Sequence, residues 1–124
     1  MRIATAEDAA ALLRPFFQGA QEERVAVLHL DAERRVLGVT QEAAGGREEV
    51  RLPVAAILGA ALKLGSHGIV VAHNHPGGDP QPSEGDRGAT RSLAGAAAGI
   101  DIRLVDHLIF AGDDCVSLVA LGLL

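Results

Sequence analysis

The sequence predicts an α/β fold in which a mixed β-sheet is flanked by helices. Short runs rich in valine and isoleucine, such as residues 68–73, alternate with longer segments in which apolar residues recur at helical spacing, such as residues 54–64. Glycine- and proline-rich turns separate these segments. The expected order is a helix, three strands, a helix, a strand, a helix and two strands, and a central mixed sheet covered by helices satisfies that order.

The first half of the chain is expected to begin with a helix over residues 6–14. Thr5 and Asp8 have the spacing of a capping box, in which each residue bonds the backbone of the other. Pro15 should end or kink this helix because its ring excludes a helical hydrogen bond. The strands expected next cover residues 23–30, 34–40 and 48–52.

The second half is expected to begin with the helix over residues 54–64, ended by Gly65 as its C-cap residue. The apolar strand 68–73 follows and leads into a loop rich in proline and glycine. Beyond that loop we expect a helix over residues 84–98 and a closing hairpin formed by residues 102–110 and 115–119.

Composition limits the classes of protein to which the chain can belong. Its 124 residues, 48% of them hydrophobic, predict one domain over residues 1–124 with an aliphatic core. No apolar run reaches the roughly 20 residues of a membrane span, and no secretory signal is visible, so we expect a cytoplasmic protein. The single cysteine, Cys115, excludes an internal disulfide, and we expect a buried, inert thiol.

Net charge and aromatic content argue against direct nucleic-acid binding. The formal charge is −5, whereas such binding depends on clustered lysine and arginine side chains. Three phenylalanines, without tyrosine or tryptophan, are too few for a base-stacking platform. A protein or peptide partner is therefore expected, and the apolar C-terminus, residues 121–124, could dock on a second copy to form a homodimer.

The most informative motif is H-x-H-x7-S-x-x-D, formed by His73, His75, Ser83 and Asp86. Residues i and i+2 of a strand point to the same face, so the two histidines at the end of strand 68–73 should aim at one point. The loop between them and Ser83 can bring Asp86, on the first turn of the next helix, to the same point. Two imidazoles and one carboxylate leave a fourth position open for water, as in catalytic zinc sites.

Each member of this motif also has a purely structural interpretation. The histidines could be hydrogen-bonded core residues, and Asp86 could interact only with the helix dipole. Ser83 and Asp86 have capping-box spacing, so Ser83 could be no more than an N-cap. Asp79 should organise the loop before Pro80 through an Asx turn, with a bond to a ligand histidine as a second role.

A metal-activated water still requires a base to take up its proton. Alternation along the strand places Glu23 on the same face as Val25 and Val27, where a purely solvated charge would be a poor neighbour. Glu23 is therefore the candidate base, and Glu22 is its competitor. His107 follows Asp106 within a strand and is interpreted as structural.

The residues from His73 to Asp86 resemble the JAMM motif of the JAB/MPN metalloprotease superfamily. The stretch HNHPGGDP over residues 73–80 is similar to the RadC branch in particular, as are segments 69–72 and 101–109. The resemblance covers nearly the whole chain and implies a cytidine-deaminase-like JAB/MPN fold. Full-length RadC-like proteins usually carry an N-terminal helix-hairpin-helix region, for which this chain has no room.

The resemblance implies a zinc-dependent peptidase or isopeptidase. In it His73, His75 and Asp86 would hold Zn²⁺, Glu23 would be the general base, and Ser83 would hydrogen-bond the bound water or the developing oxyanion. Two alternatives stay open. The same ligand set could hold non-haem Fe(II). The chain could also be a non-catalytic module that binds a protein partner in DNA repair or mobile-element biology.

Overall fold

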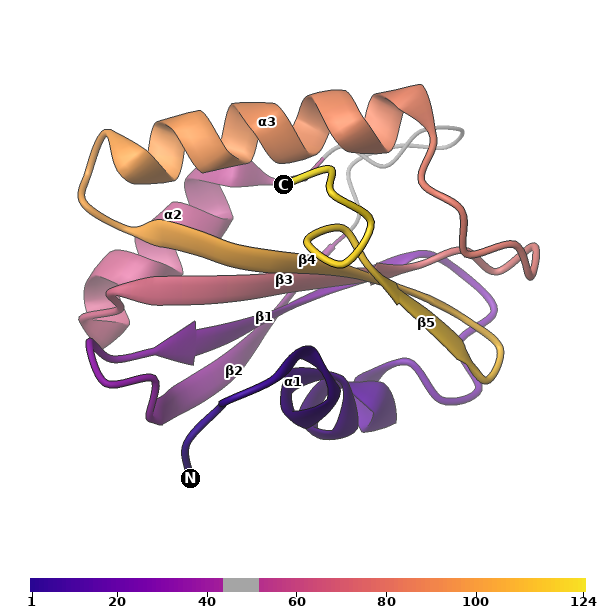
Figure 1. The fold of residues 1–124 in the computed structure, drawn as a ribbon, viewed down its shortest axis with the longest axis horizontal. Coiled ribbons are helices and arrows are strands. Elements are labelled where there is room, and N and C mark those ends of the chain that lie inside the picture. The colour runs from indigo at the N-terminus through magenta and orange to yellow at the C-terminus, as the bar shows by residue number, and fades with distance from the viewer. Residues whose placement is uncertain (44–51) are drawn as a thin grey trace.

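The computed structural model describes residues 1–43 and 52–124, which form a five-stranded sheet with helices on both faces (Figure 1). The predicted α/β class is confirmed. The strands lie in the order β2-β1-β3-β4-β5. The elements in chain order are α1 (Ala6–Leu13), the 3-10 turn η1 (Arg14–Phe16), β1 (Arg24–Leu30), β2 (Val36–Ala43), α2 (Val54–Leu64), β3 (Gly68–Asn74), α3 (Glu84–Ala98), β4 (Arg103–Ala111) and β5 (Asp114–Ser117).

The sheet is mixed because one of its pairs is parallel. β3 and β4 run parallel and are joined through α3, whereas β1 pairs antiparallel with both β2 and β3, and β4 pairs antiparallel with β5. A parallel pair requires a crossover connection, which α3 supplies. The carboxyl end of β3, which carries His73, therefore lies close to the N-terminus of α3, which carries Asp86.

Alternate residues of the central strands build two separate cores. Figure 1 shows α2 and α3 on one face of the sheet and α1 on the other. On the face of α2 and α3, one set of β1 and β3 side chains packs against leucine, isoleucine and alanine of these helices. That set comprises Val25, Val27, Ile69 and Val71. The set that packs on the α1 face comprises Ala26, Leu28, Leu30, Val70 and Ala72.

The helix ends follow the predicted capping signals. Thr5 and Asp8 form both bonds of a capping box before α1, which ends at Leu13. Pro15 lies in the η1 turn that follows, and because it has no N–H it cannot continue the hydrogen bonds of α1. α2 covers residues 54–64 as predicted, and Gly65 ends it in the left-handed region, with φ of 71°.

Several strand boundaries differ from the predictions. β2 begins at Val36 instead of residue 34 because Arg34 adopts a φ of 64° in the turn before it. The Asp31 carboxylate fixes that turn by accepting bonds from the N–H groups of Glu33 and Arg35, each at 2.8 Å. β5 ends at Ser117 instead of residue 119. The strand expected over residues 48–52 lies outside the described residues, apart from Leu52.

The helices of residues 1–43 and 52–124 include none long and apolar enough to cross a bilayer.

Candidate metal centre

The carboxyl end of β3 supplies two histidines to one site. His73 lies within β3 and is fully buried, and His75 follows the strand by one residue and is largely buried. Because alternate residues share a face, His73 points to the side of α3, as Ile69 and Val71 do. The spacing that predicted convergence of the two imidazoles is confirmed, and their Nε2 atoms lie 3.1 Å apart.

Asp86 reaches the same point from the first turn of α3. Its Oδ2 accepts a 2.8 Å bond from the Ser83 backbone N–H, and Ser83 Oγ accepts a 3.0 Å bond from the Asp86 N–H. This capping box fixes the direction of the carboxylate, so capping and alignment for metal binding coexist. Burial raises the pKa of the Asp86 carboxyl, but when His73 Nε2 carries a proton, the bond from this ring and the bond from the Ser83 N–H outweigh burial and hold the pKa below its ordinary value.

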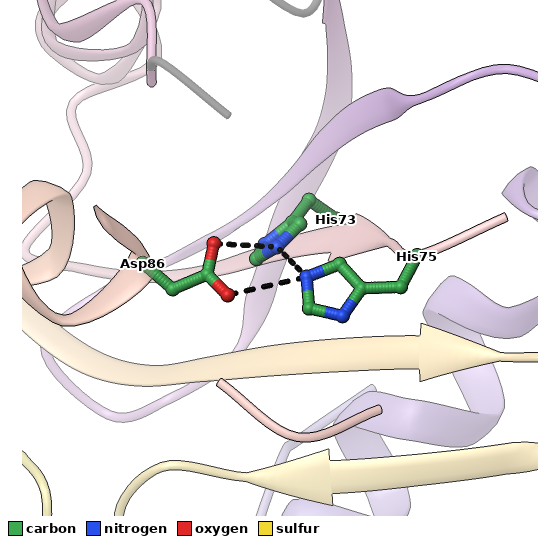
Figure 2. Close-up of side chains that lie close together, drawn as sticks. All are labelled: His73, His75 and Asp86. Atoms are coloured by element: carbon green, nitrogen blue, oxygen red, sulfur yellow. Dashed lines mark hydrogen bonds and ion pairs between the residues drawn. The ribbon is translucent and has the colours of Figure 1, made fainter. Parts of the chain in front are cut away.

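The three side chains face a common centre (Figure 2). The carboxylate of Asp86 presents one oxygen to each imidazole, at 3.3 Å from His73 Nε2 and 3.2 Å from His75 Nε2. One ligand atom from each residue lies within 4.8 Å of the others. This arrangement is a candidate metal site, and the sequence predicted all three of its members.

The three side chains suit a metal ion because imidazole lone pairs and carboxylate oxygens can all bind a cation. His75 Nδ1 lies 2.8 Å from the Asp79 carbonyl oxygen, which can only accept, so Nδ1 carries the proton. The Nε2 of neutral His75 therefore has a lone pair, and this lone pair faces the Asp86 carboxylate. A cation between these groups removes their repulsion, and ligand histidines commonly donate their other N–H to a backbone carbonyl in this way.

Asp79 forms the predicted Asx turn with its side chain and contacts His75 with its backbone. Its Oδ1 accepts a 3.0 Å bond from the Gln81 N–H, which is the predicted Asx turn. Its carbonyl, instead of its carboxylate, contacts His75.

Two buried residues that the sequence did not assign to the site lie behind His73. His107 Nε2 is 2.7 Å from His73 Nδ1, and Thr90 Oγ1 is 2.6 Å from His107 Nδ1. His107 was interpreted as structural, and it contacts His73, one of the three candidate ligands. Burial, together with the neighbouring histidines, lowers the pKa of His107 to about 3, so the ring is neutral. The sequence alone carries no distinct signal for this pair, because His107 follows Asp106 on β4 and Thr90 precedes Arg91 on α3.

Glu23, the candidate base, lies one residue before β1 and is half-buried, whereas its competitor Glu22 is exposed. No hydrogen bond or ion pair joins its carboxylate to the three ligands within the part of the chain that the structure describes. Val25 pairs with His73 in the antiparallel register, and Glu23 lies two residues beyond this last pair, at the same end of the sheet. The structure thus brings the Glu23 segment to the site without fixing a contact.

Asn74 holds this segment in place. Its Oδ1 accepts a 2.7 Å bond from the Arg24 N–H, and its Nδ2 donates a 3.1 Å bond to the Glu22 carbonyl. The two bonds lie on either side of Glu23. Asn74, which sits between the two histidines in sequence, was not predicted to have this role.

A cleft of about 320 Å³ opens beside His75. The residues that line it include Arg14, Phe17, residues 18–20, Phe110 and Asp113. Arg14 lies over the Phe110 ring and donates a 3.2 Å bond to the Asp113 carbonyl. A ligand could therefore approach His75 from this side.

Cys115 lies away from this chemistry. The thiol is half-buried on β5, and burial raises its pKa to about 11. A thiol with such a pKa is protonated at neutral pH and is a poor nucleophile, in agreement with the inert thiol expected from the sequence.

Comparison with known proteins identifies the family. The model of the RadC-like JAB domain matches residues 3–123. The chain belongs to the RadC-like JAB domain family. Relatives of this RadC-like chain include the UPF0758 protein Bpet3149 of Bordetella petrii, 38% identical over 102 residues, which are 82% of this chain and 45% of that one. A UPF0758 protein of Coxiella burnetii is 36% identical over 118 residues, 95% of this chain and 53% of that one.

A UPF0758 protein of Vibrio cholerae is 34% identical over 119 residues, which are 96% of this RadC-like chain and 75% of that protein. The chain thus spans about half the length of several of its curated relatives. The family match and the five-stranded mixed sheet agree with the expected JAB/MPN fold.

Proposed function

We propose that this RadC-like domain is a zinc-dependent hydrolase that cleaves a peptide or isopeptide bond. The observation that carries the proposal is the convergence of His73, His75 and Asp86 on one centre, with protein ligands for three positions of a metal. Hydrolytic zinc sites combine three such ligands with one position left for water. Membership of the JAB family supports the same chemistry.

The types of ligand fit zinc. Zinc binds histidine nitrogens and carboxylate oxygens, and its hydrolytic sites combine three such protein ligands with a water. Non-haem Fe(II) uses the same types of ligand, so metal analysis of protein purified without added metal separates the two ions.

The remaining residues supply proton transfer and stabilisation of charge. Zinc held by the three ligands would lower the pKa of a bound water to about 7 and polarise a substrate carbonyl. Glu23 accepts the proton of the attacking water and delivers it to the leaving amine. Asn74 keeps the Glu23 segment beside β3. Ser83 donates a hydrogen bond to the developing oxyanion from its place at the start of α3.

The proposed substrate is a peptide or protein, and direct binding of nucleic acid is disfavoured by the net charge of −5. The cleft beside His75 offers room for residues next to the scissile bond. The rival proposal, a non-catalytic module with a protein partner, predicts that the zinc-loaded domain cleaves neither peptides nor isopeptides.

Glu23→Gln tests the proposal, with Glu22→Gln as the matched control one residue away. We expect zinc to remain bound in both variants, because neither residue is a ligand. Cleavage of fluorogenic peptides and of a lysine-linked isopeptide should fall by about 10²–10⁴-fold in Glu23→Gln and stay unchanged in Glu22→Gln. Full activity of Glu23→Gln with zinc bound would remove Glu23 from the mechanism. Absence of cleavage by the zinc-loaded wild type across both substrate classes would favour the non-catalytic module.

A further inference from the structure

A continuous chain of buried hydrogen-bonding groups leads away from His73 and returns to the backbone of another ligand. His73 Nδ1 lies 2.7 Å from His107 Nε2, and His107 Nδ1 lies 2.6 Å from Thr90 Oγ1. Thr90 Oγ1 in turn donates a 2.7 Å bond to the backbone carbonyl of Asp86. The side chains of His73, His107 and Thr90 are fully buried, so water does not compete for these bonds.

The position of each proton along these three hydrogen bonds follows from the last acceptor, the backbone carbonyl oxygen of Asp86. A carbonyl oxygen can only accept, so Thr90 gives its single hydroxyl proton to Asp86. The hydroxyl oxygen must then accept from His107, so Nδ1 of that ring carries a proton. The ring is fully buried and forms no ion pair among the described residues, so this is its single proton. Nε2 of His107 is left with a lone pair and accepts from Nδ1 of His73.

If the protons pointed the other way along these bonds, two buried acceptors would face each other. If His107 carried its proton on Nε2, its bare Nδ1 would face a hydroxyl oxygen 2.6 Å away that has already given its proton to the Asp86 carbonyl. Two acceptors at that distance in a dry interior lose a hydrogen bond and gain repulsion. The forward direction satisfies all three contacts.

We propose that His107 and Thr90 are positioning residues that fix the proton of His73 on Nδ1, so that His73 Nε2 is the metal-binding atom. The inference rests on the proposed metal site and adds to it the two residues that orient His73 and set its protonated nitrogen. Because the chain of bonds ends on the backbone of Asp86, it also ties the ligand on β3 to the helix that carries the third ligand. Helix α3 and the imidazole of His73 are thereby held in one arrangement before a metal arrives.

Metal affinity of His107 and Thr90 variants tests this role. His107→Leu removes the acceptor of His73 Nδ1–H, and we expect zinc affinity, measured by competition with a chromophoric chelator, to fall about 10–100-fold. His107→Gln should restore much of it, since an amide can accept from His73 and donate to Thr90. Thr90→Val should weaken binding, and Thr90→Ser should retain it. Wild-type affinity in both His107→Leu and Thr90→Val would overturn the inference.

His29→Leu is the matched control for a general loss of stability. His29 is also fully buried on the sheet and contacts two hydroxyl groups, Ser66 at 2.9 Å and Thr40 at 2.8 Å. It pairs with Ile69 at the start of β3, whereas His73 lies at the other end of that strand. A purely structural role for His107 predicts that both leucine variants behave alike. The proposed role predicts that only His107→Leu loses zinc affinity.

Imidazole ¹⁵N shifts measure the proton positions directly and do not require activity. We expect His107 to be the Nδ1–H tautomer in the zinc-loaded protein and in the metal-free protein. An Nε2–H tautomer of His107 in either state would overturn the inference. If the wild type binds no zinc, the proposed function fails, and the tautomer of His107 in the metal-free protein still decides the hydrogen-bond direction.

Discussion

Replacing Asp86 by asparagine should have opposite effects on the metal-free and the metal-loaded protein. The amide oxygen can still accept the bond from the Ser83 N–H, so the cap of α3 is kept. With that oxygen in the place of Oδ2, the amide nitrogen takes the place of Oδ1 and donates to the Nε2 lone pair of His73. We therefore expect the metal-free variant to be as stable as the wild type or more stable, by about 1 kcal/mol for one gained hydrogen bond.

The size of the metal effect follows from linkage between binding and folding. Zinc at 1,000 times its Kd stabilises the wild type by about 4.1 kcal/mol. Loss of a partner of a ligand typically costs about 10–100-fold in affinity, so loss of the anionic ligand itself should cost about 100-fold or more. The same zinc concentration then stabilises Asp86→Asn by at most about 1.4 kcal/mol.

These free energies correspond to measurable shifts of Tm. The 124 residues give an unfolding entropy of about 0.26 kcal/mol/K near the transition, so zinc should raise Tm by about 16 °C in the wild type and by at most about 5 °C in Asp86→Asn. Calorimetry with and without zinc, after treatment with a chelator, provides both values. An equal rise of Tm in the two proteins would show that the carboxylate is not a ligand.

Two further perturbations separate stability from chemistry. Ser83→Ala and Thr5→Ala each remove one capping box, so each should lower stability by about 1 kcal/mol in urea unfolding, but only Ser83→Ala should also lower peptide cleavage, by about 10²-fold or more. Equal activity of the two variants would leave Ser83 as a cap alone. Burial lowers the pKa of His29, so below pH 6.5 the unfolded chain binds more protons and stability falls as pH decreases. In metal-free protein His29→Gln should reduce that slope by up to about 1.4 kcal/mol per pH unit, and an unchanged slope would contradict the argument.

The three candidate metal ligands could be predicted because the interactions that position them are local. His73 and His75 share a strand face by alternation, and the capping box directs Asp86 from a position three residues after Ser83. The helix ends were predictable for the same reason, since Thr5 and Gly65 act on their own helix.

The groups behind and beside the ligands depend on contacts between distant segments. His107 reaches His73 only because β4 lies parallel to β3, in a register that pairs Val71 with His107. Asn74 reaches Glu22 and Arg24 only because β1 lies antiparallel on the other side of β3. Spacing along the sequence contains neither the order of the strands nor their register, so these roles emerge only from the fold.

An anomalous difference map from crystals grown with zinc tests the central claim most directly. We predict one peak at the end of β3, bonded to His73 Nε2, His75 Nε2 and the Asp86 carboxylate, with a non-protein fourth ligand. Absence of a peak there, or a peak bonded through Nδ1 of His73, would contradict the account.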